Sequence, residues 1–223
     1  GKIIDDNSTG FDIDAPNAIL SAASGIGFDT GGNVDALEVN VDNLHVRNSS
    51  SGGIFIDNTG DLNLTVLNSS LAGNAALAAT GGGNISATGS ISVDDNATFT
   101  VNLELAAGVN LTIASNVTLS GTGELLLQAD NDILHTAGTI GGGTLTAIFD
   151  ADFDNSGEGF ISQTGGALQA TNASFLSGED ITLDQNNTVS TISAESGGAF
   201  TFVDTGSVVV GNVDTVAGIT TSG

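Results

Sequence analysis

Apolar and polar residues alternate along many short stretches of this chain, for example over residues 62–66, 101–105 and 109–113. Such a period of two residues is typical of β-strands with one buried face. Further runs with strand character occupy residues 54–56, 91–93, 117–119, 125–127, 181–183, 200–202 and 208–210. Gly, Asn, Asp and Ser residues bound these runs and predict turns. The alanine-rich residues 75–79 are the nearest approach to a helix, and three glycines follow them closely, so the pattern predicts an all-β protein.

The strands and turns group into units of roughly 20 residues, a period typical of solenoids. We therefore predict a right-handed parallel β-helix of about ten coils with open ends, which at ~4.8 Å per coil gives a rod ~50 Å long. Composition is uniform along residues 1–223, which predicts a single solenoid segment. The chain begins with neither methionine nor a signal peptide, so we expect it to be a segment or repeat unit of a longer protein.

A β-sandwich or barrel is the structural alternative, because both also use many short alternating strands. Three features favour the solenoid: aromatic residues make up only 4%, Pro16 is the single proline, and Asn is frequent at outward positions, where it can stack in ladders on successive coils. Since Trp, Tyr, Met and Cys are absent, the core must come from Ala, Val, Ile and Leu with 10 Phe.

The charge is strongly unbalanced, with Lys2 and Arg47 against 26 acidic residues and a formal net charge of -24. Such a surface repels nucleic acid and anionic lipid. Two interpretations remain open: solubility of a repetitive β structure, or a saline or cation-rich setting. The lack of cysteine excludes disulfides and suits a long secreted chain. No apolar run approaches the roughly 18 residues of a membrane helix, so no membrane insertion is expected.

A family resemblance rests on Gly25-Ile26-Gly27, on residues 33–44 and 53–64 and, near the end, on residues 187–192, 198–206 and 213–223. These segments resemble the repeat region of filamentous haemagglutinin-like bacterial adhesins. The resemblance implies a parallel β-helix shaft, export through a dedicated outer-membrane transporter, an extracellular or cell-surface location, and roles in adhesion, biofilm or cell contact. It supplies no catalytic residues. The family's secretion domain, with its Asn-Pro-rich motifs, is missing, which leaves the export route open.

Parallel β-helices also include polysaccharide lyases and hydrolases, whose sites need clustered carboxylates with Arg, Lys or His. Here His45 and Arg47 form one basic pair on a strand face, and the other basic groups are far off in sequence. One such pair cannot supply a typical lyase site, so we do not expect an enzyme. The pair is expected on a solvated strand face, with contacts to Asp42 or Glu38 of adjacent coils as the alternative.

Asp150, Asp152 and Asp154 are candidate calcium ligands, because hard cations bind to several converging carboxylate oxygens. We place these alternating aspartates on one strand face, where they repel one another unless a cation screens them. The EF-hand pattern is not met, since Asn155 stands at its sixth position and Ile161 at its twelfth. No other cofactor is expected.

Asn-x-Ser/Thr sequons recur along the chain, which has two explanations. Strand alternation turns Asn and the following Ser or Thr to the same outward face; alternatively, the sites are glycosylated on a surface protein. The sequons are at Asn7, Asn48, Asn63, Asn68, Asn84, Asn96, Asn110, Asn116, Asn172 and Asn186.

These observations predict the structural shaft of a secreted cell-surface adhesin or extracellular fibre, which displays or spaces other domains. One alternative is a self-assembling filament subunit, because open solenoid ends present unpaired strand edges. Another is a carbohydrate-binding solenoid, although without Trp or Tyr it lacks the usual aromatic platforms. The expected partners are other copies or flanking repeats of the chain, and cell-surface glycans or proteins.

Overall fold

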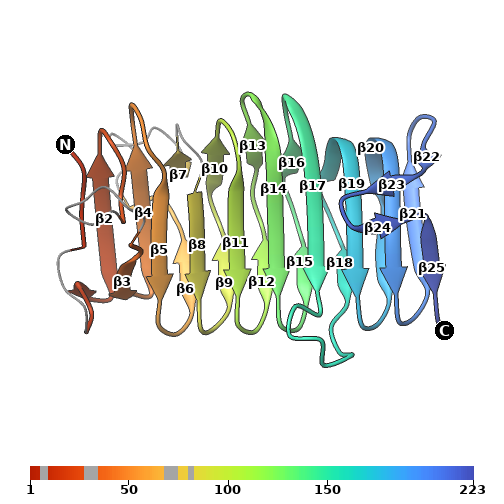
Figure 1. Ribbon diagram of the computed structural model, residues 1–223, viewed down its shortest axis with the longest axis horizontal. Coiled ribbons are helices and arrows are strands. Elements are labelled where there is room, and N and C mark those ends of the chain that lie inside the picture. Colours follow the sequence, from red (N-terminus) through yellow and green to blue (C-terminus); the bar gives the residue numbers. More distant parts are fainter. Residues whose placement is uncertain (6–9, 28–34, 68–74, 80–82) are drawn as a thin grey trace.

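The computed structural model describes residues 1–5, 10–27, 35–67, 75–79 and 83–223, and every regular element in them is a β-strand (Figure 1). Strands from successive coils pair in parallel, and the one antiparallel pair among the described residues joins β23 to β24. The protein is a parallel β-solenoid of about nine turns, which confirms the predicted fold class. None of the described residues forms a helix long and apolar enough to cross a membrane.

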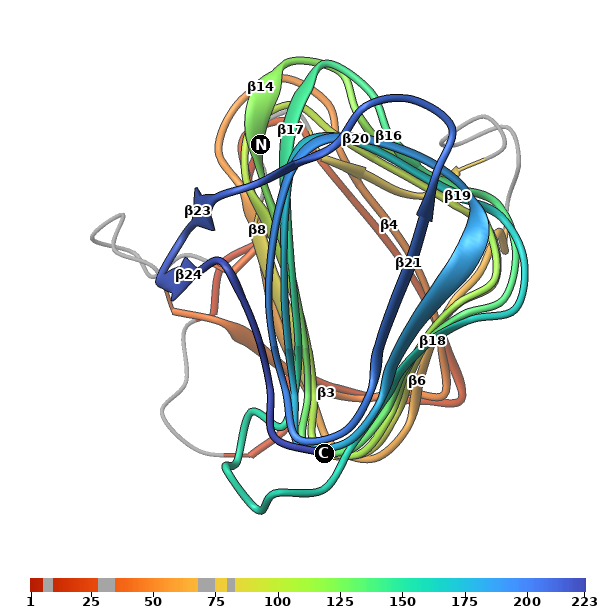
Figure 2. The same ribbon diagram turned by 90° about the vertical axis from the view of Figure 1, so that its right-hand side faces the viewer.

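Viewed nearly along its axis, the solenoid has a three-sided outline (Figure 2). Side 1 contains β1 (Ile13–Asp14), β3 (Leu37–Asn40), β5 (Ile54–Asn58), β8 (Gly83–Ala87), β11 (Leu103–Ala107), β14 (Thr122–Ala129), β17 (Thr144–Ala151), β22 (Val209–Val210) and β25 (Ile219–Thr221). Side 2 contains β6 (Leu62–Leu64), β9 (Ile91–Val93), β12 (Leu111–Ile113), β15 (Ile133–His135), β18 (Ile161–Gln163) and β21 (Phe200–Asp204).

Side 3 contains β2 (Asn17–Ala22), β4 (Asn43–Asn48), β7 (Ala75–Ala79), β10 (Asn96–Phe99), β13 (Val117–Leu119) and β16 (Thr139–Gly141). Two long strands turn corners: β19 (Ala167–Ser177) runs from side 3 to side 1, and β20 (Ile181–Ser196) contributes to all three sides. The hairpin of β23 (Asn212–Val213) and β24 (Val216–Ala217) packs against β20.

Coil length varies more than the sequence suggested. One turn of the solenoid leads from Thr191 to its partner Val209, whereas a much longer turn leads from Val46 to its partner Leu77. The longer coils carry excursions at the corners, such as residues 152–160 between β17 and β18. The expected coil length was therefore too short for several coils, and the expected number of coils was slightly too high.

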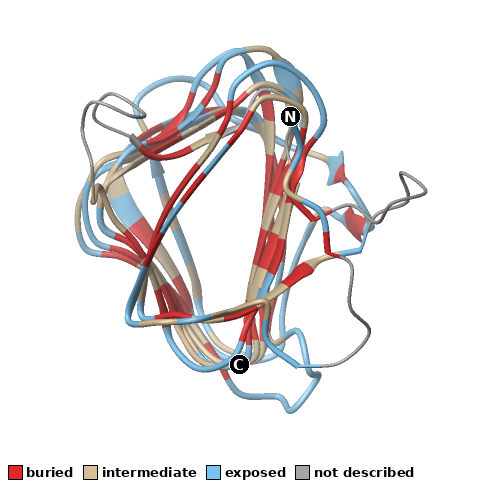
Figure 3. Ribbon diagram, turned by 90° about the vertical axis from the view of Figure 1, so that its left-hand side faces the viewer, coloured by how far each residue is buried: buried red, intermediate tan, exposed pale blue. Residues whose placement is uncertain are grey.

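The core consists of columns of inward side chains that follow the strand register. On side 1, Ile56 pairs with Ile85, and the column continues in register through Leu105, Leu127, Phe149, Phe175 and Ala194. All seven are at most 1% exposed, and buried positions line the interior of every side (Figure 3). Apolar side chains therefore stack on apolar side chains from coil to coil, and removal of this apolar surface from water is the main contribution to stability.

Aromatic rings fill the core toward the C-terminal end. The ring centroids of Phe149 and Phe175 lie 5.2 Å apart, and Phe175 lies 6.0 Å from Phe202, which belongs to side 2. Tilted pairs at these separations add to the stabilisation from burial. Ring packing across the interior thus links sides 1 and 2 in the last coils.

Asn and Asp side chains stabilise the corners by accepting backbone N–H groups of the neighbouring coil. The Oδ1 atom of Asn102 accepts from Glu124 N at 3.0 Å, and that of Asn110 accepts from Asp132 N at 3.0 Å. Each bond satisfies a donor that the strand ladder leaves as the chain turns. The Asn ladder is also confirmed: Nδ2 of Asn43 donates to Oδ1 of Asn17, on the coil before it, at 3.0 Å.

Candidate functional site

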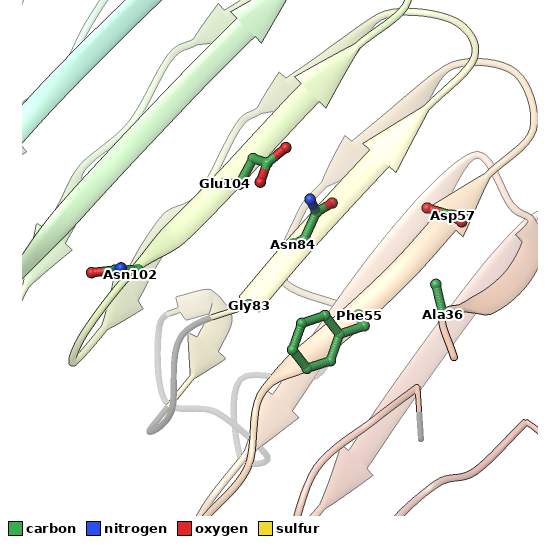
Figure 4. Close-up of a pocket in the computed structure, with 7 residues that line it drawn as sticks. All are labelled: Ala36, Phe55, Asp57, Gly83, Asn84, Asn102 and Glu104. Atoms are coloured by element: carbon green, nitrogen blue, oxygen red, sulfur yellow. The ribbon is translucent and has the colours of Figure 1, made fainter. Parts of the chain in front are cut away.

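A shallow groove of about 560 Å³ runs across the outer face of side 1, over β5, β8 and β11 (Figure 4). The groove is formed by outward side chains that alternate with the buried core positions of these strands. Phe55, Asn84 and Glu104 pair in register, so they form one row parallel to the solenoid axis. The lining residues are Ala36, Phe55, Asp57, Gly83, Asn84, Asn102 and Glu104.

The groove offers hydrogen-bond acceptors and negative charge. Its charged lining residues are Asp57 and Glu104, and neither Lys2 nor Arg47 lines it. Ser86 Oγ donates to Asp57 Oδ1 at 2.5 Å, which orients that carboxylate. Asn102 lines one end of the groove and uses its Oδ1 atom to accept a hydrogen bond from the next coil. The arrangement suits binding of a polar or cationic molecule.

Acidic oxygens converge at a second place, near the N-terminal end. Asp5, Asp35 and Glu38 each place a carboxylate oxygen within 4.8 Å of the others, which is the one such group in the described part of the chain. Burial raises the pKa of Glu38, and the negative charges of Asp5 and Asp12 raise it further. Three such oxygens are a partial ligand set for a hard cation. Sequence reasoning missed this group because Asp5 and Glu38 come together only through the coil register.

The candidate calcium residues do not share one strand face. Asp150 is the penultimate residue of β17, whereas Asp152 and Asp154 lie in the loop that follows. Asp152 Oδ1 accepts the Gly157 N–H at 2.9 Å, and Asp154 Oδ1 accepts from Ser156 N at 3.1 Å. The strand assignment was wrong because β17 ends at Ala151, after which these two carboxylates cap loop N–H groups.

Asp150 nevertheless faces a small hollow of about 210 Å³ that Asp152 and Glu195 also line. Burial raises the pKa of Asp150, with a further contribution from the charge of Asp152, while hydrogen bonds from the Asp152 backbone and the Gln128 side chain oppose the rise. Calcium binding by Asp150, Asp152 and Asp154 stays a prediction, and the oxygens of these three side chains do not form a converging group.

The sequons fall into three sets. Asn7 and Asn68 lie outside the described residues. Asn48 is 1% exposed and its Nδ2 atom donates to Ser51 O and Gly52 O, at 2.8 and 2.6 Å, so the folded chain has no room for a glycan there. The remaining sequons lie at least partly exposed, as strand alternation requires, and their glycosylation stays a prediction: Asn63, Asn84, Asn96, Asn110, Asn116, Asn172 and Asn186.

The two histidines are both buried. His45 is 0% exposed, so the expected solvated face was wrong for His45, whereas Arg47 on the same strand is half-buried. His135 lies inside a corner between sides 2 and 3, where Gln163 Nε2 lies 3.3 Å from its Nδ1 atom and Gly138 O lies 3.2 Å from its Nε2 atom. Since a carbonyl only accepts, Nε2 carries the proton and Nδ1 accepts. Burial lowers the pKa of His135, which favours the neutral form of the ring.

The same interior network continues to Asn187 on the next coil. Asn187 and Gln163 exchange two amide hydrogen bonds of 2.9 Å, and Asn187 Oδ1 also accepts the Leu168 N–H at 2.8 Å. Asn187 Nδ2 donates to Val203 O at 3.1 Å. This network is structural: it joins backbone and side chains of successive coils inside the core, and it does not open to the groove. Sequence reasoning missed it because inward and outward polar residues look alike along the chain.

Comparison with known proteins gives no relative from which a function can be transferred. No family model, no curated protein and no solved structure matches the chain. The solenoid and its surfaces are therefore the basis on which a function can be inferred.

Proposed function

We propose that this chain is a structural shaft, a rod-like segment of a secreted cell-surface adhesin or extracellular fibre that spaces or displays other domains. The observation that carries the proposal is the uninterrupted stack of about nine coils, joined by backbone ladders that run along the axis. Because parallel ladders and columns of inward apolar side chains continue from coil to coil in the described residues, the stack is a stiff rod of about 43 Å at ~4.8 Å per coil.

Composition supports the proposed location. A cysteine-free, acidic, glycine-rich chain suits export unfolded and solubility outside the cell. Antibody labelling of intact and permeabilised host cells tests this part of the proposal. We expect intact cells to be labelled, and labelling that requires permeabilisation would contradict a surface location.

The spacer role is tested by removing one coil in phase. Leu111 pairs with Ile133, so deletion of residues 111–132 joins equivalent positions of successive coils. We expect a folded rod shortened by about 5 Å with the functions of its flanking domains retained. A control deletion of residues 111–121, half a coil, breaks the register and is expected to misfold. Loss of function in a folded in-phase variant would show that this coil does more than provide length.

One observation favours a second function, assembly of the chain into filaments. The last coil exposes Val208, Val209 and Val210 at 37%, 60% and 54%, respectively. An exposed edge strand of apolar residues is a template for pairing with another chain, and a head-to-tail contact that does not close gives a filament. Sedimentation over a range of concentrations at high salt tests this, because salt screens the charge of -24. We expect the sedimenting species to become larger as the concentration rises, and we expect Val209→Lys to abolish this increase. A monomer at every concentration would contradict assembly.

A further inference from the structure

The outer groove of side 1 is independent of the core that makes the rod. Phe55, Asn84 and Glu104 stand on successive strands in register, and Asp57 and Asn102 stand at its margins (Figure 4). Neighbouring parallel strands are ~4.8 Å apart, so the row of three side chains is ~10 Å long, comparable to two sugar rings. The groove is therefore elongated, shallow and rich in hydrogen-bonding groups, which fits a section of a linear polymer rather than a compact ligand.

The charge of the groove selects the class of that polymer. Asp57 and Glu104 are its charged lining residues, in a chain of net charge -24. Uronic acids, sulfated sugars and other polyanions would be repelled. Protonated amines would instead form charge-assisted hydrogen bonds with the two carboxylates. Asn84, as an amide, both donates and accepts and so matches neighbouring hydroxyl groups.

The backbone around the groove argues against an extended peptide as the occupant. β8 pairs with β5 on one side and with β11 on the other, so its backbone groups are used in the ladder. Strand addition, which gives extended peptides their affinity, needs an unpaired edge. The groove therefore offers a ligand its lining side chains, of which Phe55 is the one aromatic group.

We propose that this groove binds a cationic amino-sugar oligomer, with Asp57 and Glu104 accepting hydrogen bonds from its ammonium groups and Asn84 exchanging hydrogen bonds with its hydroxyls. This inference goes beyond the shaft function and does not depend on it. A rod with an empty groove would still be a spacer, and the in-phase deletion of residues 111–132 leaves every lining residue of the groove in place.

The test is calorimetric titration of the full chain with a glucosamine hexamer at a pH at which its amines are protonated. We expect saturable binding that Asp57→Asn with Glu104→Gln weakens about tenfold, since each exposed charge contact is worth a factor of about three to five. The matched control removes two exposed carboxylates elsewhere, Asp184→Asn with Glu179→Gln, and is expected to leave the affinity unchanged. Binding to the fully N-acetylated hexamer should be weaker, and wild-type affinity should fall as salt rises.

Three results would overturn the proposal. Absence of binding at millimolar hexamer would exclude the ligand class. Equal weakening by the control pair would show that the oligomer responds to overall charge and not to the groove. A lysine hexamer that binds as tightly, and loses affinity in the same Asp57→Asn/Glu104→Gln variant, would make the groove a site for basic peptides. Circular dichroism of each variant establishes that it remains folded.

Discussion

Substitution of Asn187 by alanine is expected to destabilise the solenoid strongly, although the residue is polar and its neighbour in sequence is dispensable. Asn187 is 0% exposed. Its side chain accepts from Leu168 N at 2.8 Å, exchanges two bonds with Gln163 and donates to Val203 O at 3.1 Å. Asn187→Ala removes this hydrogen-bond partner from the Leu168 N–H, the Val203 carbonyl and the Gln163 side-chain amide. At about 1–3 kcal/mol for each buried group that loses its hydrogen bond, we expect a loss of about 4 kcal/mol.

Urea denaturation measures this loss, and Asn186→Ala is the matched control. Asn186 is exposed, so its replacement should change the free energy of unfolding by at most about 0.5 kcal/mol. Amide exchange gives a local readout, because the Leu168 N–H should exchange faster in Asn187→Ala. Gln163→Ala should cost less, and the double variant less than the sum of the two, since both remove the same pair of bonds. Equal stability of Asn187→Ala and Asn186→Ala would refute the reasoning.

Three further perturbations test the core, the titration of the interior and the coil spacing. Phe175→Ala should lower the free energy of unfolding, measured in urea, by about 3–5 kcal/mol because the ring is fully buried among other rings. Phe153→Ala, in an exposed loop, should lower it by under about 0.5 kcal/mol. Similar losses in the two variants would contradict the aromatic packing. Burial lowers the pKa of folded His135 below its ordinary 6.5, so the unfolded chain binds more protons and stability should fall as pH drops below about 6.5. In His135→Gln the unfolding midpoint should decline less steeply as the pH falls. An unchanged decline would show that a group other than His135 causes the pH dependence. Gly197→Ala would press a methyl group against a backbone carbonyl of the preceding coil and should lower the melting temperature. Gly206→Ala, where a methyl group has room, should leave it unchanged. Equal melting temperatures of the two variants would contradict the close stacking of coils.

Much of the fold follows from sequence because its two main signals are local. Alternation marks inward positions such as Leu103 and Leu105, and Asn or Asp at turns marks corners such as Asn110. Both signals act within a few residues, so strands and turns could be placed without knowledge of the register. The stacking of coils then follows, because short strands with one apolar face bury it most continuously by repetition.

The register and the surfaces it creates could not be predicted in the same way. Coils differ widely in length, as the partners of Thr191 and Val46 show, so outward residues cannot be aligned from period alone. The row of outward side chains that forms the groove exists only because β5, β8 and β11 pair in one register. The interior position of Asn187 was not predicted because a polar residue at an inward position interrupts the pattern on which the prediction relies. His45 stands at an outward position, in register with the exposed Ile19, so alternation alone predicted exposure where the structure buries it.

Electron spin resonance distances along side 2 test the central claim most directly. The outward residues Asn63, Ser92, Thr112, Leu134, Ser162, Thr182 and Thr201 pair in register from coil to coil. Because the chain has no cysteine, spin labels can be attached at pairs of introduced cysteines without other changes. At ~4.8 Å per coil, label separations should rise linearly, from ~19 Å for residues 92 and 182 to ~24 Å for 63 and 182 and ~29 Å for 63 and 201. Separations that do not increase with the number of coils, as in a sandwich, would contradict the solenoid.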